Sequence, residues 1–378
     1  MRAPTDHRVS IVIDGFEVRG WESYAITSSI VDPVDTFELA MPFDRKAWDL
    51  MRTDRPVRVM IDGICILDGF LDESPLPETE EVLHVRGRDR VGRLVQESAP
   101  GFRYRGLKLT DLVAQLASPW FTKVTLSNAR NRRVLRGRGR KAAAADEPVK
   151  LSPRKDGLAV EPGQMRWAVI EELLGQAGLL AWSAGDGKEL VVGKPNYAQE
   201  VQWRFFHPAA GSSRGREGNV LSMGIGRSTA DRYSRVIVVG SGRGTNANYG
   251  AAVSSRFGEA RDNPSDPEGV GGDFSAPKRL VLQEPVQSTA EAQALAEREL
   301  RRRAAQGHPI TVTAPLHGQL VGGAALTVFT PDTLAAVEDE RTGTRGVYLV
   351  TSCTYKSSRQ GGEQTSMNLV PKGTELAA

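Results

Sequence analysis

The sequence predicts an α+β protein that is mainly β, with two small antiparallel β modules and a shorter α+β segment between them. Two observations support this fold class. Short runs near both ends of the chain alternate apolar and polar residues, as half-buried strands do. Between these runs the apolar period lengthens to that of amphipathic helices. The length of 378 residues is enough for two or three domains.

The first β module is predicted over residues 1–97, as a small antiparallel barrel or sandwich. The run RVSIVIDGFEVRGW reads as a strand, an Asp14-Gly15 turn and a second strand, and PVRVMIDGICILDGFLDE repeats this order around Asp62-Gly63. An Asp-Gly pair between alternating runs is the strongest short signal for a hairpin. The runs TFELAMP and EVLHVRGRD supply further strands.

An α+β domain is predicted over residues 98–200. KLTDLVAQLASPW favours a short helix with Thr110 as its N-cap, and EPGQMRWAVIEELLGQAG favours a second helix that ends at Gly178. LLAWSAGDGKELVVGKP then predicts a hairpin around Asp186-Gly187.

The second β module is predicted from residues 201–240 together with 308–378, which contain five strand-like runs. Residues 241–307 are expected to be an inserted loop and helix. The part from 241 to 277 is rich in Gly, Asn, Pro and Ser and predicts a long surface loop. The helix STAEAQALAERELRRRAAQG begins with a capping box, Ser288 with Glu291.

A short internal repeat suggests that the two β modules are related. ITSSIVDPVDTFEL aligns without gaps with IGRSTADRYSRVIV. The matched positions are Ile26 with Ile225, Ser29 with Ser228, Asp32 with Asp231, Phe37 with Val236, and Leu39 with Val238. We therefore expect these two segments to have the same architecture.

The overall charge does not indicate a partner. Lys and Arg number 49 against 46 acidic residues, which leaves +3, too little for a nucleic-acid or membrane surface to be inferred from bulk charge. The two cysteines, Cys65 and Cys353, lie in strand-like runs and are expected to be free thiols. No signal peptide and no apolar run of about 18 residues is present, so we expect assembly in the cytoplasm and no membrane insertion.

No catalytic, cofactor or metal site is legible in the sequence. RVIVVGSGRGT has Gly240 and Gly242, but the third glycine position of a dinucleotide turn is Thr245 and no helix pattern follows. The five histidines are scattered without ligand spacing. We therefore predict a protein without cofactor and without enzymatic activity.

A basic loop at residues 130–141 carries the strongest local charge. Its positive residues are Arg130, Arg132, Arg133, Arg136, Arg138, Arg140 and Lys141. Nucleic acid is one candidate partner, because such a segment releases counterions from phosphates. The loop contains no aromatic residue for stacking on bases. A protein-contact or solvated loop is the favoured interpretation.

The run HVRGRDRVGRL raises the question of whether its arginines grip nucleic acid. Gly87 is expected to let the chain bend where a strand gives way to a helix. Asp89 lies between Arg88 and Arg90 and near the predicted helix N-terminus, where a carboxylate is favoured. We interpret Gly87, Arg88 and Asp89 as a structural corner rather than a DNA clamp.

Several segments together resemble one family. They are YAITSSIVDPVDTFELAMP, PVRVMIDGICILDGFLDES, LHVRGRDRVGRLVQESA, EPGQMRWAVIEELLGQAGL, NVLSMGIGRSTADRYSRVIVVG and GVYLVTSCTYKS with GGEQTSMNLVP. In this order they resemble the baseplate hub protein of Mu-like tailed phages, the tail protein P family, which is related to the T-even phage central hub. The Gly-Arg-Asp triplet is the most specific piece. The basic loop and residues 241–277 depart from the resemblance.

The resemblance implies two tail-tube-like β-barrels with smaller α+β domains, assembled as a trimeric ring. Such a homotrimer would present six similar barrels and join a sixfold tail tube to a threefold spike, with DNA only in transit through its channel. Implied partners are the tail tube or an adjoining tail protein, the spike and other baseplate proteins, within the tail baseplate of a virion. Alternatives are the hub of a contractile injection system or gene-transfer particle, a tail-associated cell-wall hydrolase, and a nucleic-acid-binding protein.

Overall fold

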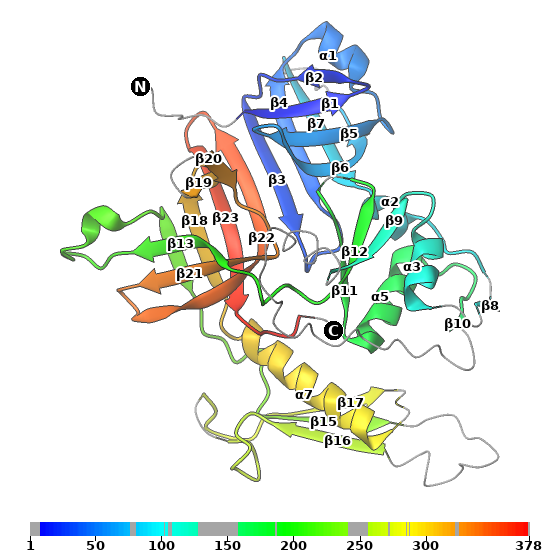
Figure 1. The fold of residues 1–378 in the computed structure, drawn as a ribbon, viewed down its shortest axis with the longest axis vertical. Coiled ribbons are helices and arrows are strands. Elements are labelled where there is room, and N and C mark those ends of the chain that lie inside the picture. Colours follow the sequence, from blue (N-terminus) through cyan, green and yellow to red (C-terminus); the bar gives the residue numbers. More distant parts are fainter. Residues whose placement is uncertain are drawn as a thin grey trace, which may run out of the picture. The chain divides into compact units, whose positions relative to one another are not determined.

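The computed structural model shows a mainly β protein with some helices (Figure 1). The chain divides into two compact units. Unit 1 combines residues 1–223 with 311–369, and unit 2 consists of residues 224–310 with a short C-terminal segment. The structure describes residues 8–75, 81–101, 103–104, 108–127, 158–185, 187–240, 256–270, 273–284, 286, 288–321 and 325–376.

The first β module confirms the predicted strands and hairpins. Its strands are β1 (Val9–Ile13), β2 (Phe16–Val18), β3 (Ser23–Ser29), β4 (Thr36–Pro42), β5 (Pro56–Ile61), β6 (Ile64–Glu73) and β7 (Val82–Asp89). Asp14 and Asp62 have positive φ, as the two Asp-Gly hairpin turns require. A short helix, α1 (Arg45–Leu50), follows β4 with Asp44 as its N-cap.

The sheet of this module turns a corner along β6. Residues 64–70 of β6 pair with β5, and from Gly69 onward β6 also pairs with β7, with a bulge between Leu71 and Glu73. Bulges bend a strand and increase its twist. Strands β1, β2 and β5 consequently run across β3, β4 and β7 (Figure 1), and apolar side chains from both layers, such as Ile11, Leu39 and Val85, are fully buried.

The α+β segment packs three helices against a small sheet. The helices are α2 (Val91–Gln96), α3 (Leu109–Ala117) and α5 (Arg166–Ala177), and the sheet has the order β11 (Leu180–Ser183), β12 (Glu189–Gly193), β9 (Lys123–Leu126). A two-stranded pair, β8 (Arg103–Tyr104) with β10 (Leu158–Ala159), adjoins them in sequence. The β11–β12 hairpin and the end of α5 at Gly178, which is left-handed, confirm the predictions.

The predicted N-cap of α3 is wrong. The helix begins one residue before Thr110, at Leu109, with Lys108 in the N-cap position and no side-chain hydrogen bond there. The burial of Leu112, Val113 and Leu116 against α5 stabilises the helix without a polar cap.

The second β module contains β13 (Val201–His207), β18 (Ile310–Pro315), β21 (Thr333–Asp339), β22 (Thr344–Ser358) and β23 (Gly362–Pro371), with the hairpin β19 (Gly318–Val321) and β20 (Ala325–Val328). A 3-10 turn, η1 (Gly215–Glu217), precedes β14 (Ser222–Ile225). The core includes Trp203, Phe205 and Phe329, whose rings contact one another.

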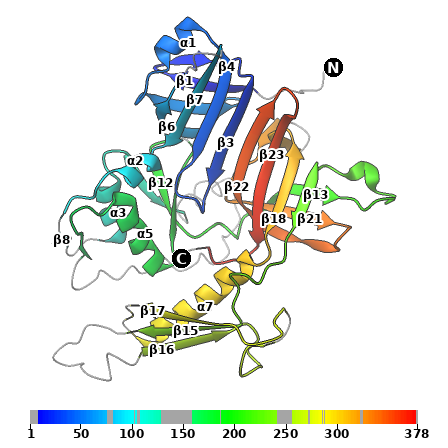
Figure 2. The same ribbon diagram turned by 180° about the vertical axis from the view of Figure 1, so that it is seen from behind.

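The two modules share one large, mainly antiparallel sheet. Its order runs β18-β23-β22-β3-β4-β7-β6-β5-β1-β2. The long strand β22 pairs with β21 through Thr344–Val350 and with β3 through Ser352–Ser357. The expectation of two separate closed barrels therefore needs correction: the described strands form a continuous sheet, with no closed ring among them. Figure 2 shows β3, β22 and β23 side by side from behind.

Unit 2 is a separate α/β layer. The strands β15 (Arg235–Gly240), β16 (Arg256–Arg261) and β17 (Arg279–Glu284) form a sheet of order β16-β15-β17, and α7 (Thr289–Gln306) covers one face. The N-cap of the predicted capping box of α7 is confirmed, since Ser288 Oγ accepts a hydrogen bond from the N–H of Glu291 at 3.1 Å.

This unit corrects three expectations. The repeat is wrong at its two windows, because Ile26 and Leu39 lie on paired strands of one sheet whereas Ile225 and Val238 lie on β14 and β15, in different sheets. Residues 235–240, expected in the second β module, belong to unit 2. The surface loop expected over 241–277 is also interrupted by β16. The buried positions of its run RFGEAR are two small residues, Gly258 and Ala260, so the run does not show the apolar alternation of a strand.

The substitution Gly258→Ala should weaken the contact between α7 and the sheet. A Cβ at Gly258 would stand 2.2 Å from the backbone carbon of Ala292, so the helix must move outward. We expect a loss of about 1–3 kcal/mol in the free energy of opening of α7, the usual cost of overpacking. Hydrogen exchange across residues 289–306 measures this loss. Gly101→Ala is the control, because a Cβ there meets no atom within 4 Å; equal exchange in both variants would contradict the prediction.

Candidate functional site

Gly87, predicted to allow a corner between strand and helix, lies where three strands approach one another closely. Gly87 lies within β7 rather than at a bend between strand and helix. The ring of Phe37 on β4 and the carbonyl of Phe70 on β6 both approach it, and an added Cβ would stand 2.5 Å from the ring and 2.3 Å from the oxygen. Only glycine permits this close approach of three strands.

The arginines of the corner pair with neighbouring strands rather than with Asp89. Arg88 forms a bidentate ion pair with Asp72, with Nε to Oδ2 at 2.6 Å and Nη2 to Oδ1 at 3.1 Å. Arg90 Nε donates to Asp68 Oδ1 at 2.6 Å, in a pair whose side chains are about nine-tenths buried. The expected charge pairing of Asp89 with Arg88 and Arg90 is therefore wrong, although the arginines do act as salt-bridge formers.

Asp89 instead faces a second buried carboxyl group. Its Oδ1 accepts a hydrogen bond from the N–H of Gly92 in the first turn of α2 at 3.3 Å, as a residue near a helix N-terminus can. Its own N–H donates to the carbonyl of Asp35 at 3.0 Å. Burial and the neighbouring Asp35 raise the pKa of Asp89 well above its ordinary value.

The junction of the two β modules contains a chain of buried polar groups. His317 is fully buried, with Nε2 2.7 Å from the hydroxyl of Tyr24 on β3 and Nδ1 2.9 Å from Oγ1 of Thr365 on β23. Because Thr365 donates its own proton to the carbonyl of Leu316, it accepts from Nδ1 of His317. The contacts of His317 with Tyr24 and Thr365 connect β3 to β23.

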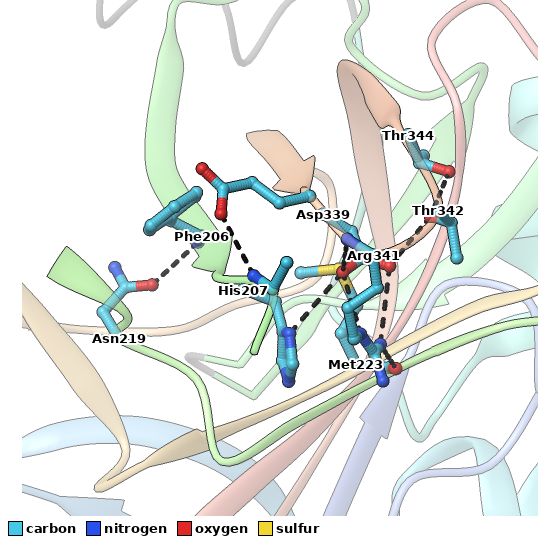
Figure 3. A network of polar contacts seen from close by, with 10 residues as sticks. Phe206, His207, Asn219, Met223, Asp339, Arg341, Thr342 and Thr344 are labelled. Carbon is cyan, nitrogen blue, oxygen red and sulfur yellow. Dashed lines mark hydrogen bonds and ion pairs between the residues drawn. The ribbon is translucent and has the colours of Figure 1, made fainter. Parts of the chain in front are cut away.

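A second polar network lies where β13 ends beside β21 (Figure 3). The buried carboxylate of Asp339 accepts from Arg341 Nε at 3.0 Å and from Thr342 Oγ1 at 2.8 Å. His207 Nδ1 lies 3.5 Å from the same carboxylate. Arg341 also donates to the carbonyl of Met223 at 2.6 Å, which connects the β21–β22 turn to the start of β14. Burial alone would raise the pKa of Asp339, but the hydrogen bonds from Arg341 and Thr342 outweigh it and hold the pKa below its ordinary value.

An ion-pair cluster surrounds this network on the outside. Arg214 donates to Glu338 Oε1 at 2.7 Å and to Glu217 Oε2 at 2.9 Å, and its guanidinium lies 4.1 Å from the centre of the Phe206 ring. The amide of Asn219 joins the same arm, accepting from the N–H of Phe206 at 2.9 Å. These contacts hold the arm between β13 and β14 against β21.

The remaining predicted groups are the two cysteines, which lie in the described part of the chain, and the basic loop, which does not. Cys65 and Cys353 are free thiols, as expected. Residues 130–141 lie outside the described part, so the basic loop has no structural account. In the described ranges, no group of three or more His, Cys, Asp and Glu side chains is placed to hold a metal ion. None of the helices described is long and apolar enough to cross a membrane.

Sequence reasoning missed the two junction networks. His317 was noted only as a scattered histidine, and Asp339 was not singled out. A weak signal existed for His317, since a histidine flanked by apolar residues and a glycine in LHG is unusual for a solvated loop. Asp339 was missed because its hydrogen bonds from Arg341 and Thr342 form only when β21 turns into β22, and because His207 is distant in the chain.

The first β module is similar to one family of phage baseplate proteins. Residues 8–89 match the family model described as Mu phage baseplate assembly protein GpP-like, N-terminal. The resemblance predicted from the sequence is thereby confirmed for this module, which contains the Gly-Arg-Asp corner. A search of curated protein sequences found no match.

Solved structures extend the similarity of fold to the whole chain. A tail protein from Neisseria meningitidis MC58 is 22% identical, with a TM-score of 0.76 and 98% of each chain covered. The 43 kDa tail protein of prophage MuSo2 from Shewanella oneidensis is 17% identical, with a TM-score of 0.71 and coverage of 99% of this chain and 100% of that one.

A more distant structure comes from a secretion machine. An E. coli component of the type VI secretion system, described as similar to the T4 tail proteins gp27 and gp5, has a TM-score of 0.54 at 10% identity, over 97% of this chain and 78% of that one. Residues 8–89 thus match a phage baseplate protein family, and the chain shares its fold with two tail proteins and with a type VI secretion component.

Asp339→Asn should destabilise unit 1. The amide removes a charge from a buried site and places a donor next to Arg341 and Thr342, so we expect a loss of about 1–3 kcal/mol. Urea unfolding at pH 7 measures it. Because the pKa of Asp339 is lowered in the folded chain, its stabilisation is present above the ordinary value of 3.8 and is lost as the pH falls through the lower, folded value. The difference between the parent and variant proteins should therefore shrink in acid.

The matched control is Glu217→Gln, which alters the exposed ion pair with Arg214 in the same region. Exposed pairs contribute about 0–1 kcal/mol, so this variant should remain close to the parent protein. A similar loss in both variants would contradict the assignment of Asp339 as the stabilising centre of the network.

Proposed function

We propose that this protein is the structural baseplate hub of a phage tail, forming a trimeric ring that joins a sixfold tail tube to a threefold spike and surrounds the ejection channel. The observation that supports this most is the combination of the family match over residues 8–89 with a fold shared over nearly the full length of two phage tail proteins. The role is mechanical, and we assign the chain no enzymatic activity.

The internal architecture is consistent with a threefold-to-sixfold adaptor. Each chain carries two β modules, and three chains would supply six. We propose that both modules are tail-tube-like, the first as residues 1–97 and the second around β13, β18 and β21 to β23. The shared strand β22 fixes one module relative to the other, so a ring of three chains would repeat the same spacing. This argument rests on the sheet topology and no longer on the repeat between Ile26 and Ile225.

The proposed partners are further copies of the chain, the tail tube or an adjoining tail protein, the spike, and other baseplate proteins, with DNA only passing through the channel. The corner of Gly87, Arg88 and Asp89 would keep the first module rigid within the ring. The basic loop at 130–141 would be a protein contact.

A second candidate is the hub of a contractile injection machine. It is favoured by one observation, the similarity of fold to the E. coli type VI secretion component. The two candidates share the trimeric ring and differ in the particle that contains it. Negative-stain images of particles from the source cells distinguish them, since a phage tail carries a capsid.

The purified full-length chain should be a trimer. Light scattering coupled to size exclusion should give three times the chain mass of 41.0 kDa, and class averages of negatively stained particles should show a threefold ring with a central hole. A mass that stays at one chain over the accessible concentration range, or a closed twofold dimer, would overturn the hub assignment.

The basic loop should not bind nucleic acid appreciably. Filter binding of double- and single-stranded DNA across a salt series should show weak retention, and changing the seven basic residues to Gln should leave it unaltered. A binding constant that falls steeply with salt, at roughly 0.9 in logarithmic slope per phosphate contact, and that the Gln variant abolishes, would favour the nucleic-acid alternative instead.

A further inference from the structure

We propose that Asp35 and Asp89 form a proton-dependent latch at the junction of the two β modules. While Asp35 is protonated, the latch holds the loop between β3 and β4 against the end of β7. When Asp35 becomes charged, the junction loosens. The proposal concerns the chain itself and does not rest on the hub assignment.

The two carboxyl groups are held close together by the backbone. The N–H of Asp89 donates to the carbonyl of Asp35 at 3.0 Å, and the N–H of Asp35 in turn favours the charged form of Asp89. Asp89 is 2% exposed and Asp35 is 5% exposed. Neither group therefore has bulk water to stabilise a negative charge.

The surrounding donors are divided unequally between the two groups. Asp35 accepts from the N–H of Ser29 at 2.8 Å and from Oγ of Ser28 at 2.9 Å. Asp89 accepts from backbone N–H groups at Oδ1, and its buried Oδ2 has no hydrogen-bond partner in the described structure. Protonation of Asp89 therefore costs less than protonation of Asp35, and Asp35 is the member that can be charged.

No cation of the described corner neutralises the pair. The guanidinium of Arg88 attracts Asp89 but is engaged in its bidentate pair with Asp72, and Arg90 is engaged with Asp68. The other titratable groups that face Asp35 are Asp32 on its own loop and Cys353 and Tyr355 on β22, none of which is positive. Two buried carboxyls without a cation cannot both be ionised at low cost.

The pKa shifts agree with this geometry. Burial, opposed by the hydrogen bonds from Ser29 and Ser28, raises the pKa of Asp35 to about 7. The pKa of Asp89 is raised well above its ordinary value by burial and by Asp35. Asp35 therefore titrates near neutral pH, beside a second carboxyl group whose pKa is also raised.

The position of Asp35 explains why its charge would affect the junction. The N–H of Ile30 donates to the carbonyl of Thr351 at 3.0 Å, where β22 leaves β21 and begins to pair with β3. Ser29, which holds the Asp35 carboxyl, pairs with Ser352 of β22. A negative charge on Asp35, next to the point where β22 passes from β21 to β3, is incompletely solvated. It therefore favours opening of this part of the sheet to water.

The sign of the pH effect follows from the raised pKa of Asp35. Between the ordinary value of 3.8 and about 7 the folded junction binds more protons than the opened one. Its stability is therefore fully present below the ordinary pKa and is progressively lost as the pH rises toward 7. One proton changes the opening equilibrium by at most about tenfold per pH unit.

Hydrogen exchange of the full-length protein tests the latch. Exchange at pH 5, 6, 7 and 8, corrected for the intrinsic pH dependence, is compared between peptides covering residues 28–37 and 348–355 and a reference peptide covering β12. We expect protection at the junction to fall between pH 5 and 7 relative to the reference. In Asp35→Asn this fall should become shallower, because only Asp89 then releases a proton on opening, while Asp49→Asn, a change in an exposed ion pair on α1, should retain the full fall.

Asp89→Asn provides a second, independent variant. Its amide can donate to Asp35 and lower the pKa of Asp35, so the fall in protection should move to lower pH rather than vanish. Protection that is independent of pH in the parent protein, that rises with pH, or that falls equally in Asp35→Asn, overturns the latch. The mass of each variant in solution is measured alongside, so that a change in assembly is distinguished from a change at the junction.

Discussion

The pairing of one long strand, β22, with strands of both β modules is the constraint on which unit 1 depends. β22 runs for fifteen residues, and its first half completes the second β module while its second half extends the sheet of the first module. Each ladder supplies backbone hydrogen bonds that cannot be satisfied by water once the strand is buried. Sliding β22 by one residue would move Cys353 and Tyr355, both fully buried, to the opposite face. The polar contacts at the junction, from Tyr24 through His317 to Thr365, allow the same single register.

The arginine-rich corner shows how charge can serve packing rather than recognition. Each of Arg86, Arg88 and Arg90 reaches a carboxylate on an adjacent strand, namely Glu38, Asp72 and Asp68. Alternation along β7 places Arg86 and Arg88 on one face and leaves Gly87 and Asp89 on the buried face, where Gly87 admits the Phe37 ring. Arg90 follows the strand, at the N-cap of α2. The same alternation that makes the motif look like a basic patch in the sequence therefore separates its charges from its buried carboxyl.

Sequence signals predicted those features that depend on neighbouring residues. The hairpins at Asp14 and Asp62, the end of α5 at Gly178 and the N-cap of α7 are local, and the structure confirms them. The fold class followed from the same local periods. The pairing of β22 with β3 joins residues more than 300 positions apart, so no local pattern could reveal it. At the candidate site, the residues of the corner were identified, but Arg88 and Asp89 were expected to pair with their sequence neighbours. Arg88 in fact pairs with Asp72 on β6, and Asp89 contacts Asp35 in the loop before β4.

The misassigned repeat has a physical explanation that also bears on function. Ile225 and Val238 carry the apolar spacing of β3 and β4, but β14 pairs with β18 of the second module while β15 joins a different sheet. An insertion at this point is tolerated because the second module completes its sheet with β18 and β21 to β23, which come after unit 2 in the chain. The relation between the two β modules therefore lies in the sheet they share rather than in similar sequence windows. For a ring built from three such chains, the spacing of six modules would be set by backbone hydrogen bonds within each chain, and subunit contacts would have to set only the angle between one chain and the next.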